Sequence, residues 1–137
     1  MSGIGKSTPA DGDFLLAVRF EPAWDENEWA FYFINNTDTH IEKLLLVQAG
    51  YEWGDMGNVK EVNQDFGPVR PREFILTWRD DSDAAEVRID LTFRLRTARS
   101  DETLNFEFPK LYRLRDNPED VPLLGKARFL SRPLRQT

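Results

Sequence analysis

Acidic residues gather in three polar segments of the chain, and carboxylates at that density could bind a metal ion. The groups are Asp11 and Asp13, then Asp25, Glu26 and Glu28, and finally Asp80, Asp81 and Asp83. Calcium takes about six to eight oxygen ligands, so a site requires that these loops converge in the fold. Aspartates in turns also accept hydrogen bonds from nearby backbone amides. The sequence therefore predicts solvated turns and no metal site, with calcium binding as the alternative.

Two aromatic side chains stand where they could contact a partner molecule. Trp53 closely follows Tyr51 and precedes the flexible sequence Gly54-Asp55-Met56-Gly57. Exposed tryptophan and tyrosine side chains anchor protein interfaces, and beside carboxylates their rings can also stack on a sugar. We predict that Tyr51 and Trp53 bind a protein partner, with a carbohydrate as the alternative ligand.

Residues for nucleophilic catalysis do not occur in a recognisable arrangement. The chain has one histidine, His40, no cysteine, and no serine in a Gly-x-Ser-x-Gly elbow. Gly5-Lys6-Ser7-Thr8 spells the end of a phosphate-binding loop, but Pro9 and Gly12 follow where that motif requires a helix. We therefore predict that the protein is not an enzyme and binds no cofactor.

Charge is distributed unevenly along the 137 residues, whose formal net charge is −6. Residues 1–68 hold 4 basic and 12 acidic side chains, whereas residues 69–137 hold 14 basic and 12 acidic ones. An acidic chain binds phosphate backbones poorly, so we expect no nucleic acid as partner. Residues 121–137 contain no acid. We predict that Lys126, Arg128 and Arg132 in this stretch contact an acidic protein, a second copy of the chain, or the chain's own acidic part.

Hydrophobic residues alternate along most of the chain with the period of two that marks β-strands. The alternation predicts strands over 14–20, 29–34, 41–51, 73–78, 87–96 and 104–108. The second of these is apolar on both faces, which indicates a central strand. The polar residues that follow it predict a hairpin turn into the third strand. Residues 52–67 contain three glycines and indicate a long loop.

Six or seven evenly spaced strands without a helical pattern predict an antiparallel β-sandwich of immunoglobulin-like type. A chain of this length usually forms a single domain. We expect a flexible leader over 1–12, the sandwich over 13–120 and a basic C-terminal extension over 121–137. No apolar run resembles a secretory signal or a membrane span, so we expect a cytoplasmic protein without a membrane partner.

A set of packing and turn residues also resembles a known family. The string Trp29-x-x-Tyr32-x-Ile34-Asn35-Asn36-x-Asp38 is followed by Ile41-Glu42, Gly50-Tyr51, Pro71, Glu86, Phe93, Phe106-x-Phe108-x-Lys110 and Val121-Pro122-Leu123. Over roughly residues 28–130 the chain resembles small bacterial proteins of similar length, whose members are often labelled phenylalanyl-tRNA synthetase alpha subunit. The matching residues carry no known catalytic position, so the resemblance implies no activity for particular side chains.

The sequence as a whole favours a non-enzymatic cytoplasmic β-sandwich that binds a protein partner or another copy of itself. The alternative is a ligand-binding module that uses its acidic loops for calcium or its loop aromatics for carbohydrate.

Overall fold

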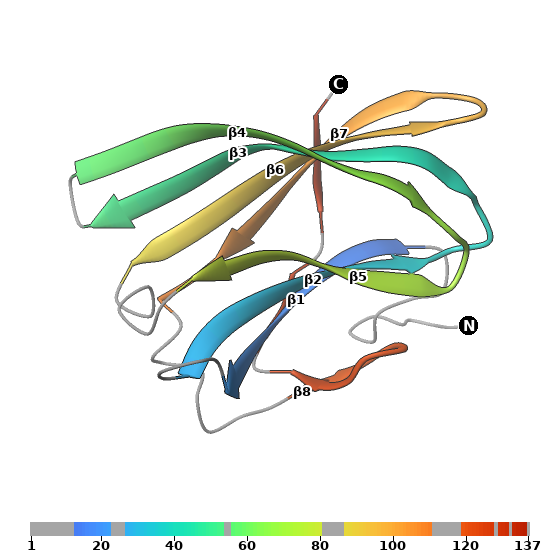
Figure 1. Cartoon of the computed structure of the whole chain (residues 1–137). Coiled ribbons are helices and arrows are strands. Elements are labelled where there is room, and N and C mark those ends of the chain that lie inside the picture. Colours follow the sequence, from blue (N-terminus) through green and yellow to red (C-terminus); the bar gives the residue numbers. More distant parts are fainter. Residues whose placement is uncertain are drawn as a thin grey trace, which may run out of the picture.

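The fold consists of antiparallel β-sheets, two of which face each other (Figure 1). The computed structural model describes residues 13–22, 27–53, 56–80, 87–110, 119–127, 129–131 and 133–136. Every regular element in these residues is a strand, and among them no helix is long and apolar enough to cross a membrane. The prediction of an all-β fold with sandwiched antiparallel sheets is confirmed.

Sheet A has the strand order β10-β1-β2-β5, and sheet B has the order β11-β7-β6-β3-β4. The long strands of the described residues are β1 (Asp13–Pro22), β2 (Asn27–Asn36), β3 (Ile41–Trp53), β4 (Met56–Val69), β5 (Glu73–Asp80), β6 (Arg88–Thr97) and β7 (Asp101–Phe108). The short ones are β8 (Glu119–Val121), β9 (Gly125–Ala127), β10 (Phe129–Ser131) and β11 (Leu134–Gln136). β8 and β9 form a separate hairpin.

The inner faces of sheets A and B form the main hydrophobic core. Successive side chains of a strand point to opposite faces, so every second residue can face inwards. β6 shows the pattern most clearly, because Ile89, Leu91, Phe93 and Leu95 are buried while Arg94 between them is exposed. Here the alternation in the sequence predicts the buried face correctly.

Phenylalanine rings join the two sheets across this core. Phe33 of β2 lies 5.5 Å from Phe93 and 6.2 Å from Phe106, measured between ring centroids. Both partners belong to sheet B, and Phe33 also stacks on Phe14 of its own sheet at 6.1 Å. Because Phe33 is fully buried and contacts rings of both sheets, it lies at the centre of the packing.

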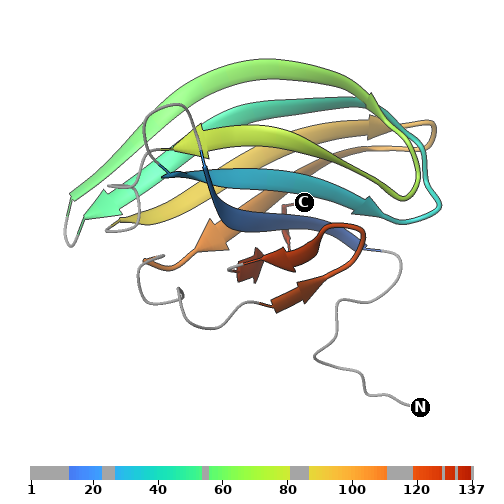
Figure 2. The same cartoon turned by 60° about the horizontal axis from the view of Figure 1, so that its bottom comes forward.

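A second, smaller core lies on the outer face of sheet A. Its buried members come from β1, β2 and the C-terminal region: Leu15, Ala17, Ile34, Val121 and Leu130. In Figure 2 the hairpin of β8 and β9 lies beside β1 on this side of the molecule. The outer side chain Ile34 and the inner Phe33 are both fully buried, so the prediction of a central strand over 29–34 is confirmed.

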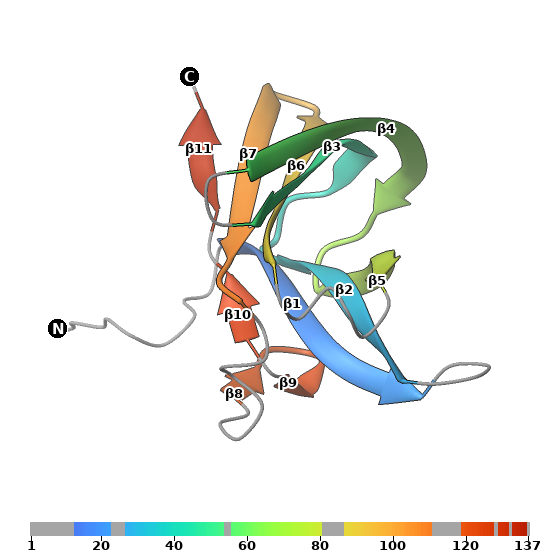
Figure 3. The ribbon, with the colours of Figure 1, turned by 90° about the vertical axis from the view of Figure 1, so that its left-hand side faces the viewer.

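The C-terminal residues add one strand to each sheet. β10 pairs with β1 in sheet A, where Leu130 lies opposite Ala17, and β11 pairs with β7 in sheet B. Figure 3 shows the two short strands following one another along one side of the sandwich. Buried Ser131 donates a hydrogen bond from Oγ to the backbone oxygen of Glu107 at 3.1 Å. β10 is therefore part of sheet A, and β11 is part of sheet B.

Two predictions from the sequence are wrong. Strands β2 and β3 do not form a hairpin, because β2 lies between β1 and β5 whereas β3 lies between β6 and β4. The turn-forming residues between them instead carry the chain from one sheet to the other. The predicted loop over 52–67 is a strand from Met56 onwards, because β4 pairs with β3 along its length. Their polar side chains suit a strand with an exposed side at the edge of a sheet.

Phe33→Ala should lower the free energy of unfolding by about 3–5 kcal/mol, because it removes ring contacts with both sheets and leaves a cavity between them. Urea unfolding followed by tryptophan fluorescence measures this loss. Val59→Ala is the control, since Val59 is 62% exposed and its truncation should cost far less. Equal losses in the two variants would contradict a central role for Phe33.

Candidate interaction surface

Tyr51, predicted to bind a partner, joins the two sheets of its own chain. Its hydroxyl donates a hydrogen bond to Asp80 Oδ2 at 2.8 Å. Trp78 Nε1 donates to the hydroxyl oxygen of Tyr51 and to the same carboxylate oxygen, both at 3.2 Å. Since Tyr51 lies in sheet B and the other two residues lie in sheet A, this triangle ties the sheets together. The hydroxyl of Tyr51 therefore stabilises the contact between the two sheets.

The structure gives less information on the other predicted binding residues. Trp53 ends β3, and Lys126 lies in β9 opposite Asp120, but the side chains of Trp53 and Lys126 are outside the described part of the chain. Arg128 and Arg132 lie outside the described residues altogether. The structure therefore does not show Tyr51 and Trp53 side by side with the basic tail, and their role in binding stays a prediction.

The acidic segments contribute few described carboxylates. Asp80 binds Tyr51 and Trp78, as above, and Glu28 Oε1 lies 3.3 Å from Arg79 Nη1. The residues outside the described ranges are Asp11, Asp25, Glu26, Asp81 and Asp83. Within those ranges, no group of three or more potential ligand side chains could hold a metal ion. Calcium binding by these segments stays a prediction.

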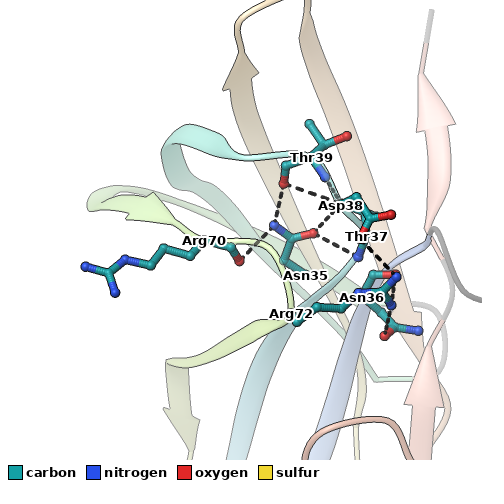
Figure 4. A network of polar contacts seen from close by, with 7 residues as sticks. All are labelled: Asn35, Asn36, Thr37, Asp38, Thr39, Arg70 and Arg72. Atoms are coloured by element: carbon teal, nitrogen blue, oxygen red, sulfur yellow. Dashed lines mark hydrogen bonds and ion pairs between the residues drawn. The ribbon is translucent and has the colours of Figure 1, made fainter.

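Asn35 is the centre of a hydrogen-bond network where the chain crosses between the sheets (Figure 4). Its Nδ2 donates to the backbone oxygens of Thr39 at 2.8 Å and Arg70 at 3.0 Å. Its Oδ1 accepts a hydrogen bond from the backbone amide of Thr37 at 3.2 Å. The fully buried amide thus satisfies carbonyl groups of two separate crossings, from β2 to β3 and from β4 to β5.

Arg72 completes this network from the β4–β5 crossing. Its Nη1 donates to Asn36 Oδ1 at 2.9 Å, and its Nη2 lies 3.2 Å from Asp38 Oδ1. Arg72 has a left-handed backbone with φ of 59°, which the tight turn at this crossing requires. Asn35, Asn36 and Asp38 belong to the string that carries the family resemblance, and all three hold the crossings in place.

A cluster of charged residues surrounds Tyr32 on the outer face of sheet A. The Tyr32 hydroxyl donates to the carboxylate of Glu21, whose oxygens lie at 2.7 and 2.9 Å. Arg19 Nε lies 3.1 Å from Glu21, and its guanidinium stands 5.7 Å from the centroid of the Tyr32 ring. Arg79 contacts both Glu21 and Glu28. Burial, together with the hydrogen bond to Glu21 and the charge of that residue, raises the pKa of Tyr32 above 10.0.

The outer face of sheet B is polar, and many of its charges are paired. Its ion pairs include Lys43–Asp65 at 3.6 Å, Arg88–Glu52 at 3.7 Å and Arg96–Asp101 at 3.3 Å. Two shallow depressions of about 150 and 90 Å³ lie among these side chains, whereas ligand pockets commonly measure about 300–1,000 Å³. The carboxylate of Asp90 lies directly over Gly50, where a Cβ atom would approach its oxygens to 2.8 Å.

Exposed apolar side chains lie on β5, which forms one edge of sheet A. Phe74 and Leu76 point outwards and are 39% and 37% exposed. Ile75 and Trp78 point inwards and pack against the main core. The ring of Tyr32 meets Phe74 edge-on, with centroids 5.9 Å apart. We define the β5 surface as Tyr32, Phe74 and Leu76, which form an apolar patch beside the charged cluster.

The sequence predicts the strand over 73–78 but not its exposed apolar side. Phe74, Ile75 and Leu76 are consecutive, and an apolar run of this kind indicates a strand covered on both faces, as in β2. Only the strand order shows that β5 lies at an edge. The apolar run that forms the β5 surface is therefore visible in the sequence, but this pattern predicts that the side chains are buried.

Comparison of the sequence with protein-family models gives no match, and comparison with curated proteins gives none.

Tyr32→Phe removes the hydroxyl that donates to Glu21. Because the pKa of Tyr32 is raised above 10.0, the variant should lose one tyrosine that ionises above pH 10.0. A raised pKa means that this residue contributes stability below pH 10.0 and loses it as the pH rises through the folded-state value. Phenolate absorbance during a pH titration and unfolding free energies on both sides of pH 10.0 measure the two effects. A titration unchanged by the substitution would contradict the assignment.

Proposed function

We propose that the protein is a non-enzymatic protein-interaction module that binds its partner through the β5 surface. The observation that carries this proposal is that β5 is an edge strand with exposed apolar residues. Extended segments of partner proteins add to such edges by main-chain hydrogen bonds, and pockets for alternate side chains give specificity. Phe74 and Leu76 supply the side-chain contacts on the outer face.

The other edge strands of sheets A and B support this choice, because each has features that discourage pairing. β4 has three register shifts against β3 between Glu61 and Val69, where Asn63 and Gly67 have left-handed backbones with φ of 58° and 73°. The rest of β4 pairs regularly but carries the exposed Lys60, a charge of the kind that protects sheet edges. β10 and β11 are each three residues long. Irregular and short strands are the means by which sheets avoid edge-to-edge association.

β5 lacks these protections over its first half. From Glu73 to Leu76 it pairs regularly with β2, and the register shift occurs at Thr77. The stretch contains no proline, glycine or lysine. Glu73, its one charged residue, accepts a hydrogen bond from the backbone amide of Arg70 at 2.9 Å. A regular, apolar edge that no other strand of the described residues covers favours a pairing role.

The residues around the patch also suit a protein interface. Interfaces have an apolar centre and a polar rim, and tyrosine, phenylalanine and arginine are enriched in them. On the outer face of sheet A, Phe74 and Leu76 lie beside Tyr32, and Arg19 and Arg79 follow at one end. The arginines are already oriented by Glu21, so less conformational freedom is lost on binding.

The non-enzymatic part of the proposal rests on how reactive side chains are used. The carboxylate of Asp80 accepts the hydroxyl of Tyr51, and Glu21 lies between Arg19 and Arg79 while it accepts the hydroxyl of Tyr32. These groups fix neighbouring strands.

We also infer that the sandwich is of immunoglobulin-like type. With β1, β2 and β5 taken as strands A, B and E, sheet A has the neighbours A-B-E. With β3, β6 and β7 taken as C, F and G, sheet B has the order G-F-C, and β4 takes the place of C′. This correspondence with immunoglobulin strand order supports the assignment.

A photoreactive phenylalanine analogue at position 76 tests the proposed function in cells of the source organism. It should form covalent adducts with a protein, because Leu76 lies in the β5 surface. The same analogue at Val59, which is 62% exposed on β4, is the matched control. Adducts specific to position 76 that disappear when Phe74→Lys is added support the proposal. No adducts, or equal adducts from both positions, would overturn it.

A further inference from the structure

We propose that the partner at the β5 surface is a second copy of this chain, whose own β5 pairs antiparallel across a two-fold axis at Ile75. The inference rests on the proposed function, since it uses the same edge. A two-fold interface places the same surface on both copies, so the strand has to be complementary to itself.

The register follows from the directions of the β5 side chains. Phe74 and Leu76 point outwards, Ile75 points to the main core, and Thr77 is the extra residue at the register shift with β2. Directly opposite residues of antiparallel strands lie on the same face of the sheet. An axis at Ile75 therefore places Phe74 of each copy opposite Leu76 of the other. The exposed apolar side chains of both copies then cover one another.

Registers displaced toward the C-terminal end of β5 are less favourable. An axis at Leu76 sets the outward Phe74 opposite the inward Trp78, so the faces do not match. An axis midway between Leu76 and Thr77 again places side chains of the same face opposite each other, because the extra residue Thr77 shifts the alternation of the strand. It sets Glu73 opposite Asp80, and like charges directly opposite each other destabilise a pair of strands. The axis at Ile75 avoids both conflicts.

Charges at the two ends of β5 also suit antiparallel pairing. Arg70 precedes the strand and is exposed, and its side chain extends away from the polar network in Figure 4. Asp80 ends the strand, next to Arg79 and its partner Glu28. Antiparallel pairing brings the first end of one β5 to the last end of the other. Arg70 of each copy thus approaches the carboxylates at the far end of the second copy.

Disulfide trapping tests both the partner and the register, because the chain contains no cysteine. Full-length Phe74→Cys and Leu76→Cys proteins are mixed in a thiol–disulfide buffer. Opposite Cβ atoms in antiparallel strands lie about 4.5–5.5 Å apart, close to disulfide range. The mixture should form heterodimers well above the ratio that random collision gives. Each protein alone should form few homodimers, because diagonal positions lie about 7–8 Å apart.

Val59→Cys mixed with Leu123→Cys is the matched control, since both positions are exposed and apolar but lie outside β5. This pair should stay at the random ratio. Light scattering over a concentration series gives a second measurement: Leu76→Lys should lower the dimer fraction of the wild-type chain, and Val59→Lys should leave it unchanged. Circular dichroism checks that each variant retains its β-sheet.

The outcomes separate this inference from the proposed function. Excess heterodimer, with loss of the dimer in Leu76→Lys, supports the second copy and the register. A random disulfide ratio with a monomeric wild type would overturn the second copy. If photocrosslinking at position 76 still gives adducts with a different protein, the proposed function stands and only the partner is wrong. Dimers that Leu76→Lys does not weaken would overturn the assignment of β5 as their interface.

Discussion

The structure depends on the contact between the inner faces of its two sheets, and Phe33 lies at the centre of that contact. Its ring packs on Phe93 and Phe106 of sheet B and on Phe14 of sheet A. The chain has no cysteine and thus no disulfide, so the described sheets are joined by packing and by polar ties at their margins. The Tyr51–Trp78–Asp80 triangle and the Asn35 network are such ties. They orient sheets that the phenylalanine rings already hold together.

The strands at the edges of the two sheets differ in how they are covered. β1 and β7 would each leave an edge open, and β10 and β11 cover them with strands of three residues. β4 remains at an edge, but its register is irregular from Glu61 to Val69. β5 differs because its first half is regular, has Phe74 and Leu76 exposed on its outer side, and is not covered by another strand of the described residues. An exposed edge of this kind favours aggregation of a monomeric protein, whereas in a protein that has a partner it provides a binding surface.

The sequence predicts the long strands well wherever one face is apolar and the other polar. In β6, Ile89, Leu91 and Phe93 alternate with exposed or polar residues, and the structure buries the predicted side. Prediction fails for β4, because Gly57, Gly67 and many polar side chains indicate a loop when the supporting strand β3 is not known. Strand neighbours cannot be predicted from alternation either, since the same pattern fits either sheet. The hairpin assigned to β2 and β3 is wrong for this reason.

Prediction of the candidate site from the sequence is limited in the same way. Tyr51 is predicted for binding because exposed tyrosine and tryptophan side chains anchor interfaces, but its hydroxyl bonds to Asp80 of the other sheet. Phe74 and Leu76 are missed because exposure depends on strand order, which involves residues distant in the sequence. Neither outcome can be derived from local pattern, because both depend on which strands become neighbours.

The late position of β10 and β11 in the chain has a consequence for synthesis. Because synthesis runs from the N-terminus, the seven long strands are made before β10 and β11. Until those two strands are made, the outer edges of β1 and β7 lack them as partners, and Leu15, Ala17 and Ile34 lack part of their cover. Such nascent states expose apolar surface and strand edges, which is the condition under which chaperones act. The fold is thus completed only after translation of its last strands.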